Sequence, residues 1–144
     1  MMYFDTSYIL KCYLNEPKAE LVRALAGQEA SKYCCRWGRV EFFAGIKRQT
    51  REGKITPEQE ADILRLFKED ETAGVWLWLP VEQSLLDSVC TVLEGLPTTA
   101  PVRGGDALHL SCAREHGFAE IYSNDRHLLA AAPHFGLVGK NVIV

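Results

Sequence analysis

Four acidic residues have the types and spacing to carry out chemistry together: Asp5, Glu41, Asp106 and Asp125. Asp5 follows the short apolar run Tyr3-Phe4, and Asp125 follows a predicted strand at residues 120–123. Hard cations such as Mg²⁺ prefer oxygen ligands, and clustered carboxylates repel one another unless a cation or a retained proton holds them together. If the fold gathers these side chains, they imply a site for a divalent cation.

The elements needed to position these acids alternate between strands and helices. We predict strands at residues 3–4, 32–35, 75–79, 120–123 and 142–144, and helices at residues 8–14, 17–26, 37–51, 57–70, 82–93, 106–116 and 126–132. No hairpin signal such as Asn-Gly joins two strands, so the pattern favours an α/β fold with a central parallel sheet flanked by helices on both faces. Ligands of such sheets bind beyond the carboxyl ends of the strands, where Asp5 and Asp125 are expected.

Two segments have a distinctive apolar pattern. Residues 75–79 are apolar at every position, which predicts a strand covered on both faces. In the helix at 37–51, the apolar positions are Val40, Phe43, Ala44 and Ile46, and Glu41 lies off this stripe. Because residues 75–79 are apolar throughout, Trp76 and Trp78 are expected in the core rather than on an RNA-stacking surface.

Length and composition indicate one folded domain over residues 1–144, because 47% apolar content can form one core and the chain is too short for two. We find no secretory leader and no long apolar run, so we expect a soluble cytoplasmic protein. Five cysteines without a C-x-x-C pair fit reduced thiols, and the spacing of Cys112 and His116 alone does not indicate zinc. The net charge of −3 excludes a generic basic nucleic-acid binder, but not an enzyme whose acids hold cations.

Each acid also has a purely structural explanation. Asp106 lies in the first turn of its predicted helix, where a carboxylate stabilises the helix dipole. Asp5 fits a turn after a strand, and Asp125 fits a cap of the helix that follows it. Glu41 fits a solvated helix face. Taken one at a time, the acids do not establish a site.

Together, four motifs occur in a recognisable order: Asp5-Thr6-Ser7 after a strand, Glu41 followed by Arg48, Asp106-Ala107-Leu108-His109-Leu110, and Ser123-Asn124-Asp125-Arg126. This order and spacing resemble the PIN-domain family, and within it the VapC-type toxin ribonucleases of toxin–antitoxin pairs. The resemblance covers essentially the whole chain. Ser123 stands where the family often has threonine, so the hydroxyl group is retained.

The resemblance implies a metal-dependent endoribonuclease that hydrolyses RNA phosphodiester bonds with Mg²⁺ or Mn²⁺, leaving a 5′-phosphate and a 3′-hydroxyl. It implies that the four acids bind the metal, and it places the assisting residues at Thr6, Ser7, Ser123 and Asn124. It also implies a cognate antitoxin protein and a homodimer. No membrane partner is expected, because the chain has no long apolar run.

Several other residues could take part in catalysis or in RNA binding. His109 lies one helical turn after Asp106, but its apolar neighbours favour a hydrogen-bonded packing histidine over a general base. Arg48 lies two turns after Glu41, where a guanidinium could hold a phosphate. With Lys47, Arg51 and Lys54 it forms a basic cluster that fits either an RNA track or a solvated face.

Two alternatives remain open at this point. A phosphotransfer protein with an acidic pocket is disfavoured, because Asp5 is followed by Thr6 and Ser7 rather than by the Asp-x-Asp of phosphatases, and a receiver-type lysine is absent near Ser123. A catalytically inactive PIN-like module that binds RNA or protein would keep the fold without turnover.

Overall fold

The strands form one parallel arrangement held together by the start of the chain. The computed structural model describes residues 1–144. Its four strands are β1 (Lys32–Cys35), β2 (Trp76–Leu79), β3 (Glu120–Tyr122) and β4 (Val138–Lys140). β1 pairs with β2 and β3 with β4, both in parallel. Tyr3 bridges in parallel to Tyr33 and Phe4 to Tyr122, so the N-terminal segment lies between the two pairs. The predicted parallel sheet is confirmed.

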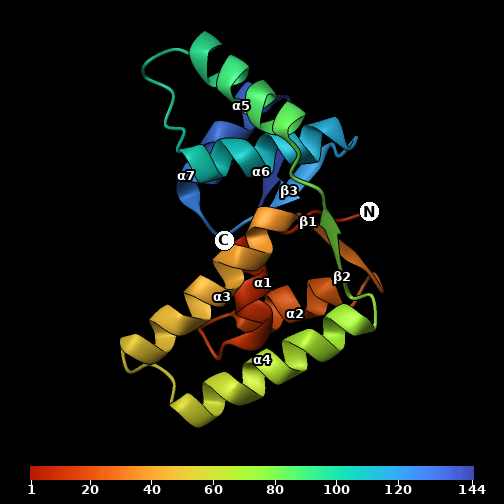
Figure 1. Ribbon diagram of the computed structural model, residues 1–144, viewed down its shortest axis with the longest axis vertical. Helices are drawn as coiled ribbons and strands as arrows, with labels where there is room; N and C mark the ends of the chain where they lie inside the picture. Colours follow the sequence, from red (N-terminus) through yellow and green to blue (C-terminus); the bar gives the residue numbers. More distant parts are fainter.

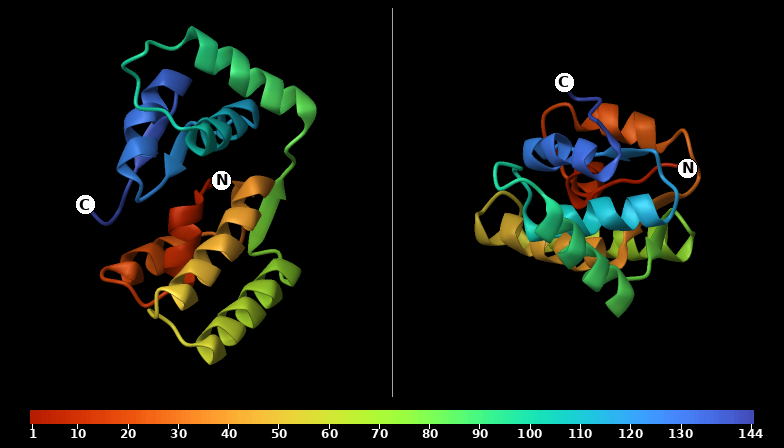
Figure 2. Two further views of the ribbon diagram at one scale, coloured as in Figure 1. Left: turned by 60° about the vertical axis from the view of Figure 1, so that its left-hand side comes forward. Right: turned by 90° about the horizontal axis from the view of Figure 1, so that it is seen from above.

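Helices cover the strands on two sides. They are α1 (Thr6–Tyr13), α2 (Ala19–Ala26), α3 (Arg36–Arg51), α4 (Pro57–Thr72), α5 (Gln83–Gly95), α6 (Gly104–Glu115) and α7 (Arg126–Ala131), followed by the 3₁₀ helix η1 (Ala132–Phe135). In Figure 1, α1 to α4 lie in the lower half of the molecule, with β2 beside them, and α5 to α7 lie in the upper half. The first view of Figure 2 shows the same division. The predicted α/β fold with helices on both faces is confirmed. None of the helices is both long and apolar enough to cross a bilayer.

Local signals in the sequence explain where several helices begin. Thr56 caps α4 through the backbone N–H of Gln59, whose side chain in turn accepts from the N–H of Thr56, and Pro57 occupies the first helical position. This capping box satisfies two N–H groups that the first helical turn leaves unpaired. α2 begins later than predicted, at Ala19, because Lys18 adopts a left-handed conformation.

Aromatic packing anchors α1, α3 and α4 to one another. Phe42 of α3 stacks on Phe67 of α4 with ring centroids 4.0 Å apart. Tyr13 of α1 meets both rings edge-on. The buried stripe of α3 is Gly38, Phe42 and Ile46, each four residues apart.

The apolar stripe predicted for α3 is therefore wrong in part. Val40 is 53% exposed and Ala44 is also exposed. The prediction failed because it did not count Gly38, whose missing side chain lets neighbouring side chains reach the helix backbone. A Cβ at this position would lie 2.3 Å from the Cys34 sulfur.

Two strand predictions also need correction. β2 is an edge strand rather than one covered on both faces, since it pairs only with β1 and Leu77 is 37% exposed. The terminal strand is Val138–Lys140, not residues 142–144, where Val144 is 98% exposed. Gly136, with φ of +71°, turns the chain, and Gly139 allows close packing because a Cβ there would lie 2.8 Å from the Leu129 side chain.

Candidate active site

A cleft of about 360 Å³ opens beyond the carboxyl ends of the central strands. It is lined by ten residues, of which only Leu128 is hydrophobic. The lining residues are Asp5, Thr6, Ser7, Glu41, Arg103, Gly105, Asp106, His109, Asp125 and Leu128. The structure thus brings together all four acids selected from the sequence, although they come from distant parts of the chain.

Asp5 is the most thoroughly hydrogen-bonded of these acids. It caps α1 by accepting from the backbone N–H of Tyr8 at 3.1 Å. Its carboxylate also accepts from the hydroxyl of Ser7 at 2.6 Å and from that of Ser123 at 2.5 Å. The side chain is buried, and burial raises the pKa of Asp5 above its ordinary value, while His109 and the hydrogen bonds only partly offset this. Burial therefore disfavours the ionised form of Asp5.

The assisting residues predicted from the sequence form a network below Asp5. Ser123 is fully buried and its hydroxyl accepts from the backbone N–H of Asp125 at 2.9 Å. The Ser7 hydroxyl accepts from the backbone N–H of Asn124 at 2.9 Å. Asn124 contributes through its backbone there, while its side chain is exposed and accepts from Asn141. This network joins the turn after β3 to the start of α1.

Glu41 reaches the cleft through two partners. Its Oε1 accepts from the Thr6 hydroxyl at 2.8 Å and from His109 Nε2 at 2.6 Å. Because a carboxylate is an acceptor, His109 must carry its proton on Nε2, and Nδ1 faces the hydroxyl of Tyr3 at 2.8 Å. His109 is buried and hydrogen-bonded, as expected of a packing histidine, and it also lines the cleft.

Neighbouring groups set the protonation of His109. Burial alone lowers the pKa of the imidazole, but Cys35 and Glu41 outweigh it and raise the pKa above its ordinary value. The contribution of this imidazolium to stability is complete below the pKa of the unfolded chain and is lost as the pH rises through the folded pKa.

Arg103 is the residue of this site that sequence reasoning missed. Its guanidinium donates to both oxygens of Asp106, at 2.9 Å and 3.2 Å, and also to Asp125. Arg103 precedes α6 by one residue, three positions before Asp106, and that spacing is the only signal in the sequence. The contact with Asp125 arises from the tertiary fold, so no local pattern reveals it.

The basic cluster on α3 is not gathered with the acids. Lys47 pairs with Glu60 at 2.7 Å, and Arg48 pairs with Glu52 at 2.9 Å. Arg51 is exposed, and none of these residues lines the cleft. The expected return of Arg48 to the face of Glu41 does not occur, because its side chain turns toward the C-terminal end of α3.

A larger hollow, of about 730 Å³, lies over the outer face of α4. Its lining comes from that helix alone, between Glu60 and Thr72. It therefore gathers no residues from separate parts of the chain, whereas the acidic cleft draws on four elements and the turn after β3. We take the smaller cleft as the candidate site.

The PIN domain profile matches residues 2–133. The chain belongs to the PIN-domain family. This confirms the resemblance drawn from the four motifs. A comparison with curated protein sequences finds no significant match.

Two solved structures have a fold similar to that of this chain. The toxin VapC20 of Mycobacterium tuberculosis, described as cleaving the sarcin–ricin loop, superposes with a TM-score of 0.69 at 14% identity, covering 91% of this chain and 95% of its own. FitAB bound to the IR36 DNA fragment superposes with a TM-score of 0.64 at 17% identity, covering 98% of this chain and 94% of its own. At these identities the similarity shows the fold.

The donor set of this PIN domain fits a hard divalent cation. All four acids offer carboxylate oxygens, and two of them already converge on the cationic guanidinium of Arg103.

Asp125 gives a testable pH dependence for this PIN domain. Burial raises its pKa, but the N–H of His127 and the guanidinium of Arg103 outweigh burial and lower the pKa below its ordinary value. The ion pair therefore stabilises the fold above the unfolded pKa of about 3.9, and this contribution is lost as pH falls through the folded pKa.

We expect Asp125→Asn to lower the free energy of unfolding at pH 7 by up to about 1 kcal/mol, since the pair is partly exposed. Asparagine keeps the helix cap, so the loss should vanish in acid. Urea unfolding at pH 7 and below pH 3 measures this, and an equal loss at both pH values would exclude the ion pair as its cause.

Proposed function

We propose that this PIN domain, over residues 1–144, is a metal-dependent endoribonuclease and the toxin of a toxin–antitoxin pair. The observation that carries the proposal is the single cleft lined by Asp5, Glu41, Asp106 and Asp125. Membership of the PIN family supports nuclease chemistry, and the fold shared with a toxin supports the biological role. A cognate antitoxin, a homodimer and a cytoplasmic location complete the proposal, the last in keeping with five free cysteines.

In this proposal the four carboxylates hold Mg²⁺ or Mn²⁺. When bound, such a cation lowers the pKa of its water and stabilises negative charge on the phosphate. Ser7 and Ser123 orient Asp5, and Thr6 orients Glu41, through the hydrogen bonds described above. These hydroxyl groups keep the carboxylates aimed at the cleft.

Basic residues have two roles in the proposal. Arg103 holds Asp106 and Asp125; if a cation were bound by these carboxylates, the guanidinium would be free to face the RNA phosphate, whose geometry it matches. The second role belongs to the basic cluster on α3, which contacts the RNA backbone outside the cleft. This cluster consists of Lys47, Arg48 and Arg51.

The direct test is cleavage of RNA by the purified protein in the presence and absence of divalent cations. We expect cleavage with Mg²⁺ or Mn²⁺, no cleavage in excess chelator, and recovery when the cation is restored. Products should carry 5′-phosphates. An inactive binding module would instead retain RNA without cutting it under every condition, and that result would reject the enzyme.

Arg103→Ala should increase the affinity for Mn²⁺ by about tenfold. The guanidinium competes with the cation for Asp106 and Asp125, and hydrogen bonds to charged groups are each worth about 1.5–3 kcal/mol before discounting for exposure. Arg103 is 56% exposed, so we expect the lower end of this range, where about 1.4 kcal/mol is tenfold. Calorimetric titration with Mn²⁺ measures the change.

Arg103→Lys is the matched control, because lysine keeps the positive charge but cannot make the bidentate contact that the guanidinium makes with a carboxylate. Its affinity for Mn²⁺ should lie between those of the parent and Arg103→Ala. If removing the guanidinium left the affinity unchanged or weakened it, Arg103 would not compete with the cation.

A further inference from the structure

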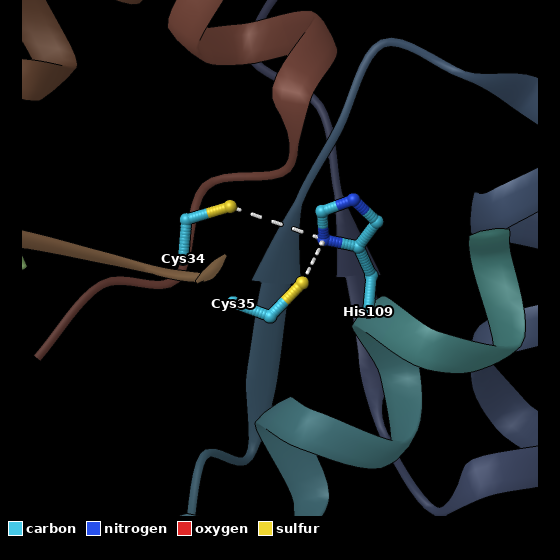
Figure 3. A group of neighbouring side chains, drawn as sticks. All are labelled: Cys34, Cys35 and His109. Atoms are coloured by element: carbon cyan, nitrogen blue, oxygen red, sulfur yellow. Dashed lines mark hydrogen bonds between the residues drawn. The ribbon is translucent and has the colours of Figure 1, made fainter. Parts of the chain in front are cut away.

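Two cysteines and a histidine meet behind the acidic cleft. Cys34 and Cys35 end β1, and His109 lies on α6. The Cys34 sulfur lies 3.9 Å and the Cys35 sulfur 3.6 Å from His109 Nδ1, and the three atoms lie within 4.8 Å of one another. Figure 3 shows both sulfurs directed at this one nitrogen.

These distances match those between ligands of a tetrahedral zinc ion. With Zn–S of about 2.3 Å and Zn–N of about 2.0–2.1 Å, tetrahedral ligands lie roughly 3.5–3.8 Å apart. The three side chains therefore need only small shifts to share one ion. Two thiolates and an imidazole are a soft donor set, unlike the carboxylates of the cleft.

The hydrogen bond on the other side of the imidazole also fits a metal ligand. A ligating histidine commonly donates its second N–H to a carboxylate, which fixes the ring and its tautomer. Here His109 Nε2 lies 2.6 Å from Glu41, so Nε2 keeps its proton, and in the neutral ring the Nδ1 lone pair faces the thiols. The hydroxyl of Tyr3 occupies this lone pair, and a metal ion would displace it.

The surrounding backbone favours the thiolate form of Cys35 and leaves room for both cysteines. Cys35 is the N-cap of α3, where unpaired N–H groups stabilise negative charge. Gly38 in the first turn of α3 has no side chain, and a Cβ there would lie 2.3 Å from the Cys34 sulfur and 3.3 Å from His109 Cε1. Glycine is therefore required for the three ligands to meet.

We propose that Cys34, Cys35 and His109 form a second metal site, which binds one thiophilic divalent cation of the Zn²⁺ class. All three side chains are buried, and His109 also lines the acidic cleft. Binding displaces protons from the thiols, so the affinity rises with pH. Because His109 is hydrogen-bonded to Glu41, a metal ion bound at this site would also fix the position of Glu41 in the acidic cleft. The proposal does not depend on nuclease activity.

The test is titration of the reduced full-length protein with Cd²⁺, monitored by the ultraviolet absorption of cadmium–thiolate bonds. We expect the absorption to saturate at one Cd²⁺ per chain. The Cys34→Ala/Cys35→Ala double variant should lose it, and Cys90→Ala, which removes an exposed cysteine on α5, should keep it. Glu41→Ala should weaken binding by about 10- to 100-fold, as expected when a carboxylate that orients a ligating histidine is removed.

Absorption that never develops in the parent protein would overturn the proposal, whether or not the double variant folds. So would absorption that survives in the double variant, since other cysteines would then be the ligands. Asp106→Asn should bind Cd²⁺ through the thiols as the parent does. A protein that cleaves no RNA but shows this absorption would reject the proposed nuclease and keep the thiolate site.

Discussion

Asp5→Asn is expected to abolish metal-dependent RNA cleavage, lowering kcat/KM by at least roughly 10²–10³-fold, the loss seen when one preorganised electrostatic group is removed from an active site. Asparagine has nearly the shape of aspartate but lacks the charge that attracts the cation. Its carbonyl oxygen can still accept from the N–H of Tyr8, so the cap of α1 is kept. The loss should therefore affect chemistry rather than folding.

The same variant has an opposite effect on the stability of the metal-free protein. Because burial raises the folded pKa of Asp5 above the unfolded value, ionisation of Asp5 opposes folding at neutral pH. Asp5→Asn should therefore unfold at an equal or higher temperature than the parent at pH 7 without metal. This advantage should disappear below the unfolded pKa of about 3.9, where both proteins are neutral at this position.

Asp87→Asn is the matched control, since Asp87 is exposed on α5, outside the cleft. It should leave both the cleavage rate and the unfolding temperature unchanged. If Asp5→Asn cleaved RNA as fast as this control, the assignment of the site would be wrong.

Tyr3→Phe should lower the free energy of unfolding by about 2–4 kcal/mol. The buried hydroxyl of Tyr3 accepts from the N–H of Cys35 at 2.9 Å and contacts Nδ1 of His109 at 2.8 Å. Removing it leaves two buried polar groups without this partner, and each costs about 1–3 kcal/mol. Denaturant unfolding of the reduced, metal-free protein measures the loss.

Tyr33→Phe is the control for Tyr3→Phe. Tyr33 bridges to Tyr3 but is only partly buried, and its hydroxyl is not among the buried atoms that lack a hydrogen-bond partner. Its effect should stay within about 0.5 kcal/mol. Equal effects of the two substitutions would mean that ring packing, and not the hydroxyl group, links Tyr3 to His109.

The parts of the fold that could be predicted from the sequence depend on local signals. The helix predicted at 57–70 and the strand predicted at 32–35 depend on signals that act over a few residues, and the structure has both, as α4 and β1. β4 could not be predicted, because Gly139 reads as a loop residue and its use in a strand depends on Leu129 of α7. The buried face of α3 was misjudged for the same reason at Gly38.

The candidate site divides in a similar way. The positions of Asp5 and Asp125 follow from the rule that parallel strands share a carboxyl edge. Glu41 could not be placed by that rule, since its approach to the cleft depends on Thr6 and His109. Arg103 and the meeting of Cys34, Cys35 and His109 involve contacts between distant segments, so the linear pattern carries no signal for them.

The central claim is that the four carboxylates of the PIN domain bind a divalent cation. Calorimetric titration of the purified protein with Mn²⁺ tests it most directly, with the Cys34→Ala/Cys35→Ala variant alongside to exclude the thiols. We predict millimolar or tighter binding that is retained in this variant and lost in Asp5→Asn and Asp106→Asn. Absence of binding in the parent protein, or equal binding in the aspartate variants, would contradict the claim.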